Sequence, residues 1–256
     1  MNLEACRLVL RPRGPLEVLD LTLRLWAVEW RVYASMCVWV LLLPFLGLSA
    51  LAVATDGHWA VLAVGVAVAP CVQAPFTLLT GRLLFDANVA PAGVFKDLLP
   101  RLISLLGTWL WWPVGLVLTV PTCGYGLPVL HLGLLFSTEV ALLERHNPFR
   151  NLTRGLRLAA DALPQSGMGV MVRWVGTVWA ITVAEAFGQG VVGFVLQLGE
   201  PFGTLMNGEV TPFALAGVLL AHAGWAVYRV LLYLDVRTRT EGWDLQVGLM
   251  AAAGAR

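Results

Sequence analysis

The residues most able to do chemistry in this chain lie within apolar sequence. Thr182, Glu185 and Gln189 follow the spacing i, i+3 and i+7 and therefore share one helical face. His222 and Gln73 lie at comparable depth in two other apolar stretches. A carboxylate in such surroundings is costly unless it is protonated and hydrogen-bonded. The cluster is therefore either a proton-coupled polar pathway or a structural hydrogen-bonded cluster, and the shortness of the stripe favours the second interpretation.

Motifs of the common enzyme classes are missing. The sequence contains no G-x-x-x-x-G-K-[ST], no H-E-x-x-H and no G-x-S-x-G. Its four histidines share no metal-ligand spacing on one helix, and its four cysteines form no C-x-x-C pair. We therefore predict a protein that is not an enzyme and that has no cofactor and no metal site.

The composition places these residues in a membrane. Hydrophobic residues make up 58% of the 256 positions, and charged residues only 13%, whereas a soluble globular chain has about 25% charged residues. So few charges cannot cover a water-facing surface of this size. The net charge of +1 gives no general attraction to nucleic acid. The expected partner is therefore the lipid bilayer, and we expect no nucleic acid.

Six apolar runs are long enough to cross the roughly 30 Å hydrocarbon core of a bilayer. They cover residues 32–55, 58–81, 102–120, 127–143, 174–199 and 210–233. A cluster of helix breakers from Pro121 to Pro128 separates the third run from the fourth. We predict an all-α polytopic membrane protein with six transmembrane helices in a single membrane domain, residues 1–256. Residues 1–31 form an N-terminal arm, without a cleavable signal peptide, and residues 234–256 form a tail.

The basic residues divide the chain into two sides. All 17 Lys and Arg lie in the N-terminal arm, in the loops after the second and fourth spans, or at the C-terminal end. The three other loops carry none. By the positive-inside rule, both termini are predicted to be cytoplasmic.

Each predicted cytoplasmic segment before a span begins at a proline and continues as an amphipathic stretch. In the third, Arg150, Arg154 and Arg157 share one helical face, opposite a face that includes Phe149 and Leu156. This pattern predicts interfacial helices on the cytoplasmic side. The arginine face is suited to anionic lipid headgroups or to a protein partner, and an ordinary positive-inside flank is the alternative.

Two further features lie within the spans. Glu139, near the end of the fourth span, is predicted to snorkel or to pair with Arg145 or Arg173. Pro70 and Pro75 predict kinks in the second span, or a broken helix of the kind found in transporters.

Three segments resemble a known family. They are RPRGPLEVLD at residues 11–20, ERHNPFRNLTRG at 144–155 and YLDVRTRTEGWDL at 233–245. In this order they are similar to the bacterial six-span family called the glycerophosphoryl diester phosphodiesterase membrane domain. The resemblance implies an inner-membrane protein with cytoplasmic termini. It implies no phosphodiesterase activity, because the catalytic barrel of roughly 250 residues that is fused to some members has no room here.

Three functions are compatible with these features. The favoured one is a non-enzymatic integral membrane subunit or scaffold that acts through partner proteins or by self-association. The second is a small permease or channel, which requires Glu185, Gln73 and His222 to line a water-accessible cavity. The third is inner-leaflet lipid handling, which requires a lateral groove near Arg150 and Arg154.

Overall fold

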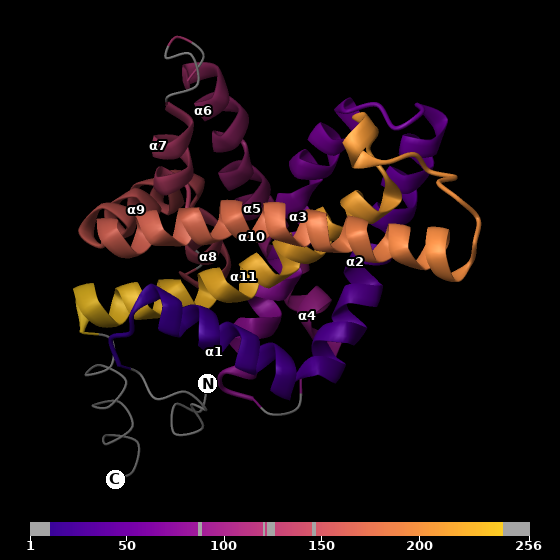
Figure 1. Ribbon diagram of the computed structural model, residues 1–256. Coiled ribbons are helices and arrows are strands. Elements are labelled where there is room, and N and C mark those ends of the chain that lie inside the picture. Colours follow the sequence, from indigo (N-terminus) through magenta and orange to yellow (C-terminus); the bar gives the residue numbers. More distant parts are fainter. Residues whose placement is uncertain (1–10, 87–88, 120, 122–125, 145–146, 243–256) are drawn as a thin grey trace. The chain divides into compact units, whose positions relative to one another are not determined.

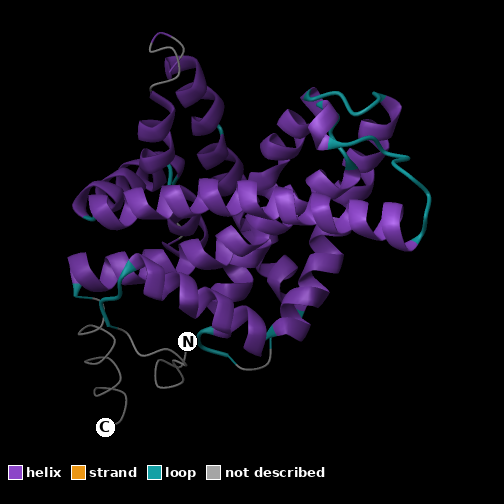
Figure 2. Cartoon of the chain, in the orientation of Figure 1, coloured by secondary structure: helices purple, strands orange, loops and turns teal. Residues whose placement is uncertain are grey.

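The computed structural model describes residues 11–86, 89–119, 121, 126–144 and 147–242. Every regular element in these ranges is a helix (Figures 1 and 2). Six helical segments are long and apolar enough to cross a membrane: Trp30–Ala54, Ala60–Leu83, Pro91–Thr119, Gly126–Glu144, Leu163–Val195 and Pro212–Glu241. The predicted all-α architecture with six membrane-spanning helices is confirmed.

The helices follow one another with short connections. The first half of the chain contains α1 (Pro15–Val28), α2 (Trp30–Ala54), α3 (Ala60–Leu83), α4 (Pro91–Leu98), the 3-10 turn η2 (Leu99–Arg101), α5 (Leu102–Trp109) and α6 (Trp111–Thr119). The second half contains α7 (Gly126–Gly133), α8 (Ser137–Glu139), the π-helical turn η4 (Val140–Glu144), α9 (Pro148–Asp161), α10 (Leu163–Gln189), the π-helical turn η5 (Gly190–Val195), the 3-10 turn η6 (Leu205–Asn207) and α11 (Pro212–Glu241).

Three short helices form where the sequence predicted them; α1 and α9 precede spans, and α4 is the first part of the segment Pro91–Thr119. Pro15, Pro91 and Pro148 each stand at the start of one of them, namely α1, α4 and α9, after a residue with extended backbone. Proline suits this position because its fixed φ is helical and the first N–H of a helix has no intrahelical acceptor. Their place at a membrane interface stays a prediction.

Two helices extend beyond the predicted spans. Helix α10 begins at Leu163, eleven residues earlier than predicted, and α11 continues to Glu241. The last turns of α11 are polar, and i,i+4 ion pairs such as Arg237–Glu241 support them. Helix α3 runs unbroken through the region of both prolines, so the broken-helix alternative is wrong.

The chain forms two compact units. Unit 1 comprises residues 1–32, 74–171 and 226–256, and unit 2 comprises residues 33–73 and 172–225. Helices α3, α10 and α11 therefore contribute residues to both. In unit 1, α9 packs against α5, α7 and α8. A Cβ at Gly155 would lie 3.3 Å from the backbone nitrogen of Ser137, so a small residue allows this close approach.

Unit 2 has its own close helix contact. A Cβ at Gly217 on α11 would lie 2.7 Å from the carbonyl oxygen of Ala180 on α10. The turn between α2 and α3 contains Gly57 with φ +69°, and the carbonyl oxygen of Gly57 accepts a hydrogen bond from the backbone N–H of Val210 at 2.7 Å. This bond attaches the α2–α3 turn to the residues that lead into α11.

Candidate functional site

A buried ion pair joins α8 to α11 in unit 1. The Glu139 side chain is 0% exposed, and Oε1 lies 2.6 Å from Nη2 of Arg229 and 2.7 Å from its Nε. The other carboxylate oxygen, Oε2, is buried without a hydrogen-bond partner among the described residues. Glu139 therefore pairs with an arginine, as one of the two predictions had it, but the partner is Arg229 of α11 and not one of the arginines named from the sequence. Its backbone turns the side chain into the core, and Arg145 lies outside the described residues.

The π-helical turn η4 explains how the carboxylates of Glu139 and Glu144 both reach side chains of α11. A π turn closes after five residues, so Glu139 and Glu144 lie near one face, whereas a regular α-helix would place them about 140° apart. Both carboxylates bind side chains of α11. The carbonyl oxygen of Leu142, within the π turn, accepts a hydrogen bond from Nη1 of Arg101 at 2.5 Å. Arg101 therefore satisfies a backbone acceptor of the irregular turn.

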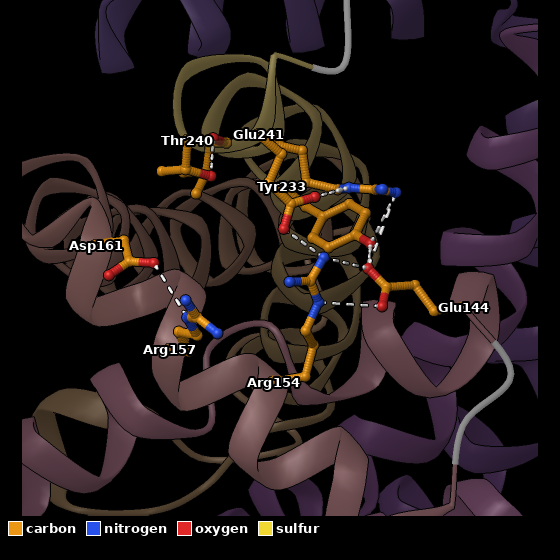
Figure 3. Close-up of polar contacts among 9 residues, drawn as sticks. Glu144, Arg154, Arg157, Asp161, Tyr233, Thr240 and Glu241 are labelled. Carbon is orange, nitrogen blue, oxygen red and sulfur yellow. Dashed lines mark hydrogen bonds and ion pairs between the residues drawn. The ribbon is translucent and has the colours of Figure 1, made fainter. Parts of the chain in front are cut away.

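Glu144 is the centre of a larger network (Figure 3). Its carboxylate accepts hydrogen bonds from Arg154 Nε at 3.2 Å and from the Tyr233 hydroxyl at 2.5 Å. Arg237 lies 3.8 Å from the same carboxylate and 3.0 Å from Glu241. Arg154 also forms an ion pair with Glu241. Two arginines and two glutamates thus balance in charge, and the network joins η4, α9 and α11.

The electrostatics of this network hold Arg154 in its charged form. Burial by itself disfavours the guanidinium cation, but the hydrogen bond and charge of Glu144 and the charge of Glu241 outweigh this effect. The pKa of Arg154 is consequently raised above its ordinary value. An exposed arginine at a headgroup site would have no such fixed internal partners.

The predicted arginine face of α9 is therefore divided. Arg154 is drawn into the network, with a side chain only 28% exposed. Arg157 lies 3.8 Å from Asp161 on its own helix, and Arg150 is exposed. The predicted apolar face is not the buried one either, since Phe149 is 72% exposed and makes an edge-on contact with the Trp111 ring at 5.3 Å.

A third face of α9 was missed by sequence reasoning. Asn151 is fully buried, and its Nδ2 donates hydrogen bonds to Thr108 Oγ1 at 2.9 Å and to Ser104 Oγ at 3.2 Å on α5. Gly155 and Leu158 lie on the same buried face. The spacing of Asn151, Gly155 and Leu158 is helical, but the first two residue types are not hydrophobic and gave no core signal.

The polar stripe of unit 2 is brought together in part. The Glu185 carboxylate accepts hydrogen bonds from Gln189 Nε2 at 3.1 Å, from the backbone N–H of Leu205 at 3.3 Å and from the Thr211 hydroxyl. Gln189 also donates to the carbonyl oxygen of Gly203 at 2.7 Å. The predicted nearness of Glu185 to the sixth span is confirmed through Thr211.

The other predicted members of the cluster make no hydrogen bond with Glu185 among the described residues. The described hydrogen bonds of Glu185 do not reach His222 or Gln73, so the predicted pairing is wrong. His222 is buried and its Nδ1 lies 2.7 Å from the carbonyl oxygen of Val218 on its own helix, and Gln73 is buried. Thr182 is exposed and donates to the carbonyl oxygen of Val178 at 2.9 Å. Glu185 is paired differently because the segment from residue 203 to 211 folds back against it.

Two larger cavities occur in unit 2, of about 480 and 460 Å³. Neither is lined by Glu185, Gln73 or His222. Within the described residues, no three His, Cys, Asp or Glu side chains are placed to hold a metal ion.

Comparison with protein-family models, with curated proteins and with solved structures finds no match for this chain. The resemblance of its three segments to the six-span bacterial family stays a prediction.

Proposed function

We propose that this chain is a non-enzymatic integral membrane subunit that acts as a scaffold, by binding a membrane-protein partner or a second copy of itself. The distribution of its 17 basic residues supports cytoplasmic termini, and the resemblance of three segments to a bacterial family supports a bacterial inner membrane. The observation that carries the proposal is the charge-balanced network that includes Glu144, Arg154 and Glu241.

This network is suited to holding helices in place. Glu144 is bound by a tyrosine and two arginines from two different helices, and its side chain is only 11% exposed. A transport site must exchange its internal contacts for contacts with a substrate in every cycle. Removing one partner of a buried charge pair is strongly destabilising, so such an exchange would be costly here. The result is a fixed base for α9, whose exposed residues Phe149, Arg150 and Arg157 form the proposed partner surface.

The permease alternative receives less support. It requires Glu185, Gln73 and His222 to share a water-accessible cavity. Instead, Glu185 is bound by the segment that leads into α11, and His222 and Gln73 are buried in other surroundings. Inner-leaflet lipid handling is also less well supported, because neither of the two larger cavities lies beside Arg150 or Arg154.

The test is crosslinking of the tagged full-length chain in its native membranes, followed by measurement of the mass of the complex. We expect a complex heavier than the monomer. The double substitution Arg150→Glu/Arg157→Glu should remove it, and the matched control Arg24→Glu, an exposed arginine of α1, should retain it.

Two outcomes would contradict the proposal. One is a chain that stays monomeric in native membranes. The other is ion or solute flux in proteoliposomes that Glu185→Gln abolishes while the thermal stability is unchanged, which would establish the permease.

A further inference from the structure

An apolar groove runs between α10 and α11 in unit 2. Its volume is about 480 Å³, within the roughly 300–1,000 Å³ of ligand cavities. Large side chains form its walls, among them Trp179, Phe187 and Phe213. The small residues Ala216 and Gly217 form its floor, where the two helices approach closely. Trp179 is 68% exposed and Phe187 is 73% exposed, so the groove opens outward from the unit.

The length of the groove matches one leaflet of a bilayer. The lining residues of α10 and η5 run from Trp179 to Val191, twelve residues apart. At about 1.5 Å per residue they are about 18 Å apart along the helix axis, a little more than half of the roughly 30 Å hydrocarbon core. Because α10 and α11 both belong to segments that are long and apolar enough to span a membrane, we expect acyl chains beside the groove.

One end of the groove adjoins a polar cavity of the same unit, of about 460 Å³. Phe202 lines this second cavity and makes an edge-on contact with Phe213 of the groove, with ring centroids 5.9 Å apart. The polar cavity is lined by the acidic residues Asp56, Glu200 and Glu209, and its lining within the described part of the chain includes no Lys, Arg or His. Its charge therefore favours a headgroup that ends in a cation over one whose only charge is the phosphate.

We propose that the groove and the polar cavity together hold one phospholipid with an amine-bearing headgroup. An acyl chain occupies the space between α10 and α11, and the headgroup ammonium lies near the three carboxylates. The positive-inside prediction assigns this end of the spans to the outer leaflet. The site is thus distinct from the α9 surface of the proposed function, and either proposal can fail without the other.

The experiment uses the intact chain in phosphatidylcholine nanodiscs and measures quenching of tryptophan fluorescence by brominated acyl chains. Brominated phosphatidylethanolamine is titrated in one series and brominated phosphatidylglycerol in another. The share of quenching that belongs to Trp179 is the difference between the native chain and Trp179→Phe. Trp39→Phe is the matched control, because Trp39 on α2 is 69% exposed and lies outside the groove.

At the same low mole fraction, we expect brominated phosphatidylethanolamine to quench Trp179 about fivefold more strongly than brominated phosphatidylglycerol. Quenching of Trp39 should not distinguish the two lipids. Ala216→Phe, which fills the floor of the groove, should reduce quenching of Trp179 to the level of Trp39.

Replacing the three carboxylates by amides, in Asp56→Asn/Glu200→Gln/Glu209→Gln, should keep the quenching but remove the preference between headgroups. Identical titrations for Trp179 and Trp39 would show ordinary boundary lipid and overturn the proposal. A preference between headgroups that persists in the amide variant would also overturn the proposal. So would the finding that no brominated lipid quenches Trp179 because a second copy of the chain covers it. The single change Glu200→Gln, at an exposed position, reports the same effect in smaller measure should the triple variant fold poorly.

Discussion

Removing one partner of the Glu139–Arg229 pair should lower the free energy of unfolding far more than removing both partners. In Glu139→Leu, the Arg229 guanidinium stays in the core with a side chain only 5% exposed and without its counter-charge. The expected loss of unfolding free energy is about 3–5 kcal/mol. In Glu139→Leu/Arg229→Met the cation is also gone, and the double variant should lie within about 1 kcal/mol of the native protein or be more stable. The rescue of one variant by the second substitution is therefore the diagnostic result.

The assay is a denaturant titration in mixed micelles followed by tryptophan fluorescence, performed on the native chain, both single variants and the double variant. The exposed pair Asp20–Arg24, 2.8 Å apart on α1, is the control, and Asp20→Asn should change the unfolding free energy by no more than about 1 kcal/mol. The reasoning is refuted if the losses of the two single variants simply add in the double variant, because contacting residues with a true interaction show non-additive effects of about 0.5–3 kcal/mol.

Three further predictions concern other parts of the chain. Glu185→Gln should fold normally, because the amide oxygen can accept the bond from the Leu205 N–H and the amide NH2 can donate to the Thr211 hydroxyl oxygen, whereas Glu185→Leu should lower stability by about 1–3 kcal/mol in the same titration. Gly217→Val should separate α10 from α11, because a Cβ there would meet the Ala180 carbonyl oxygen, and a disulfide-crosslinking scan between the two helices should detect the shift. In a background without the two cysteines of the spans, a membrane-impermeant thiol reagent should label Cys123 but not Cys6 in intact cells. Both of these cysteines lie outside the described residues, and labelling of Cys6 without permeabilisation would exclude the predicted topology.

The spans could be predicted because bilayer thickness requires long apolar runs, and such runs are visible in the sequence without any knowledge of packing. The break between α6 and α7 was equally readable from the cluster of proline and glycine beginning at Pro121. The extra turns of α10 and α11 could not be read in this way, because they depend on a helical start at Leu163 and on ion pairs such as Arg237–Glu241.

Partner choice could not be predicted for the charged residues. Glu139 was matched with arginines near it in the sequence, but its actual partner, Arg229, is 90 positions later. The π turn after Glu139 and the approach of Arg229 on α11 to this turn decide that choice, and neither has a sequence signature. Glu185 was correctly expected to lie nearest the sixth span, but it was matched with His222 near the middle of that span. The return of residues 203–211 toward Glu185 depends on backbone turns that hydropathy does not reveal.

The long separation between the partners of the buried pair has a consequence for biosynthesis. The chain is made from its N-terminus, so Glu139 leaves the ribosome 90 residues before Arg229 exists. At about 5–20 residues per second, this interval lasts roughly 5–18 s. During that time Glu139 of the fourth span has no Arg229 to pair with, so we expect its carboxylate to be protonated or to be kept out of the lipid by the insertion machinery. A longer delay applies to the N-terminal arm, whose Arg13 backbone N–H lies 222 residues before its acceptor Asp235 and reaches it only after the last span has been synthesised. The synthesis of unit 1 therefore starts before that of unit 2 and ends after it, because unit 1 contains both ends of the chain.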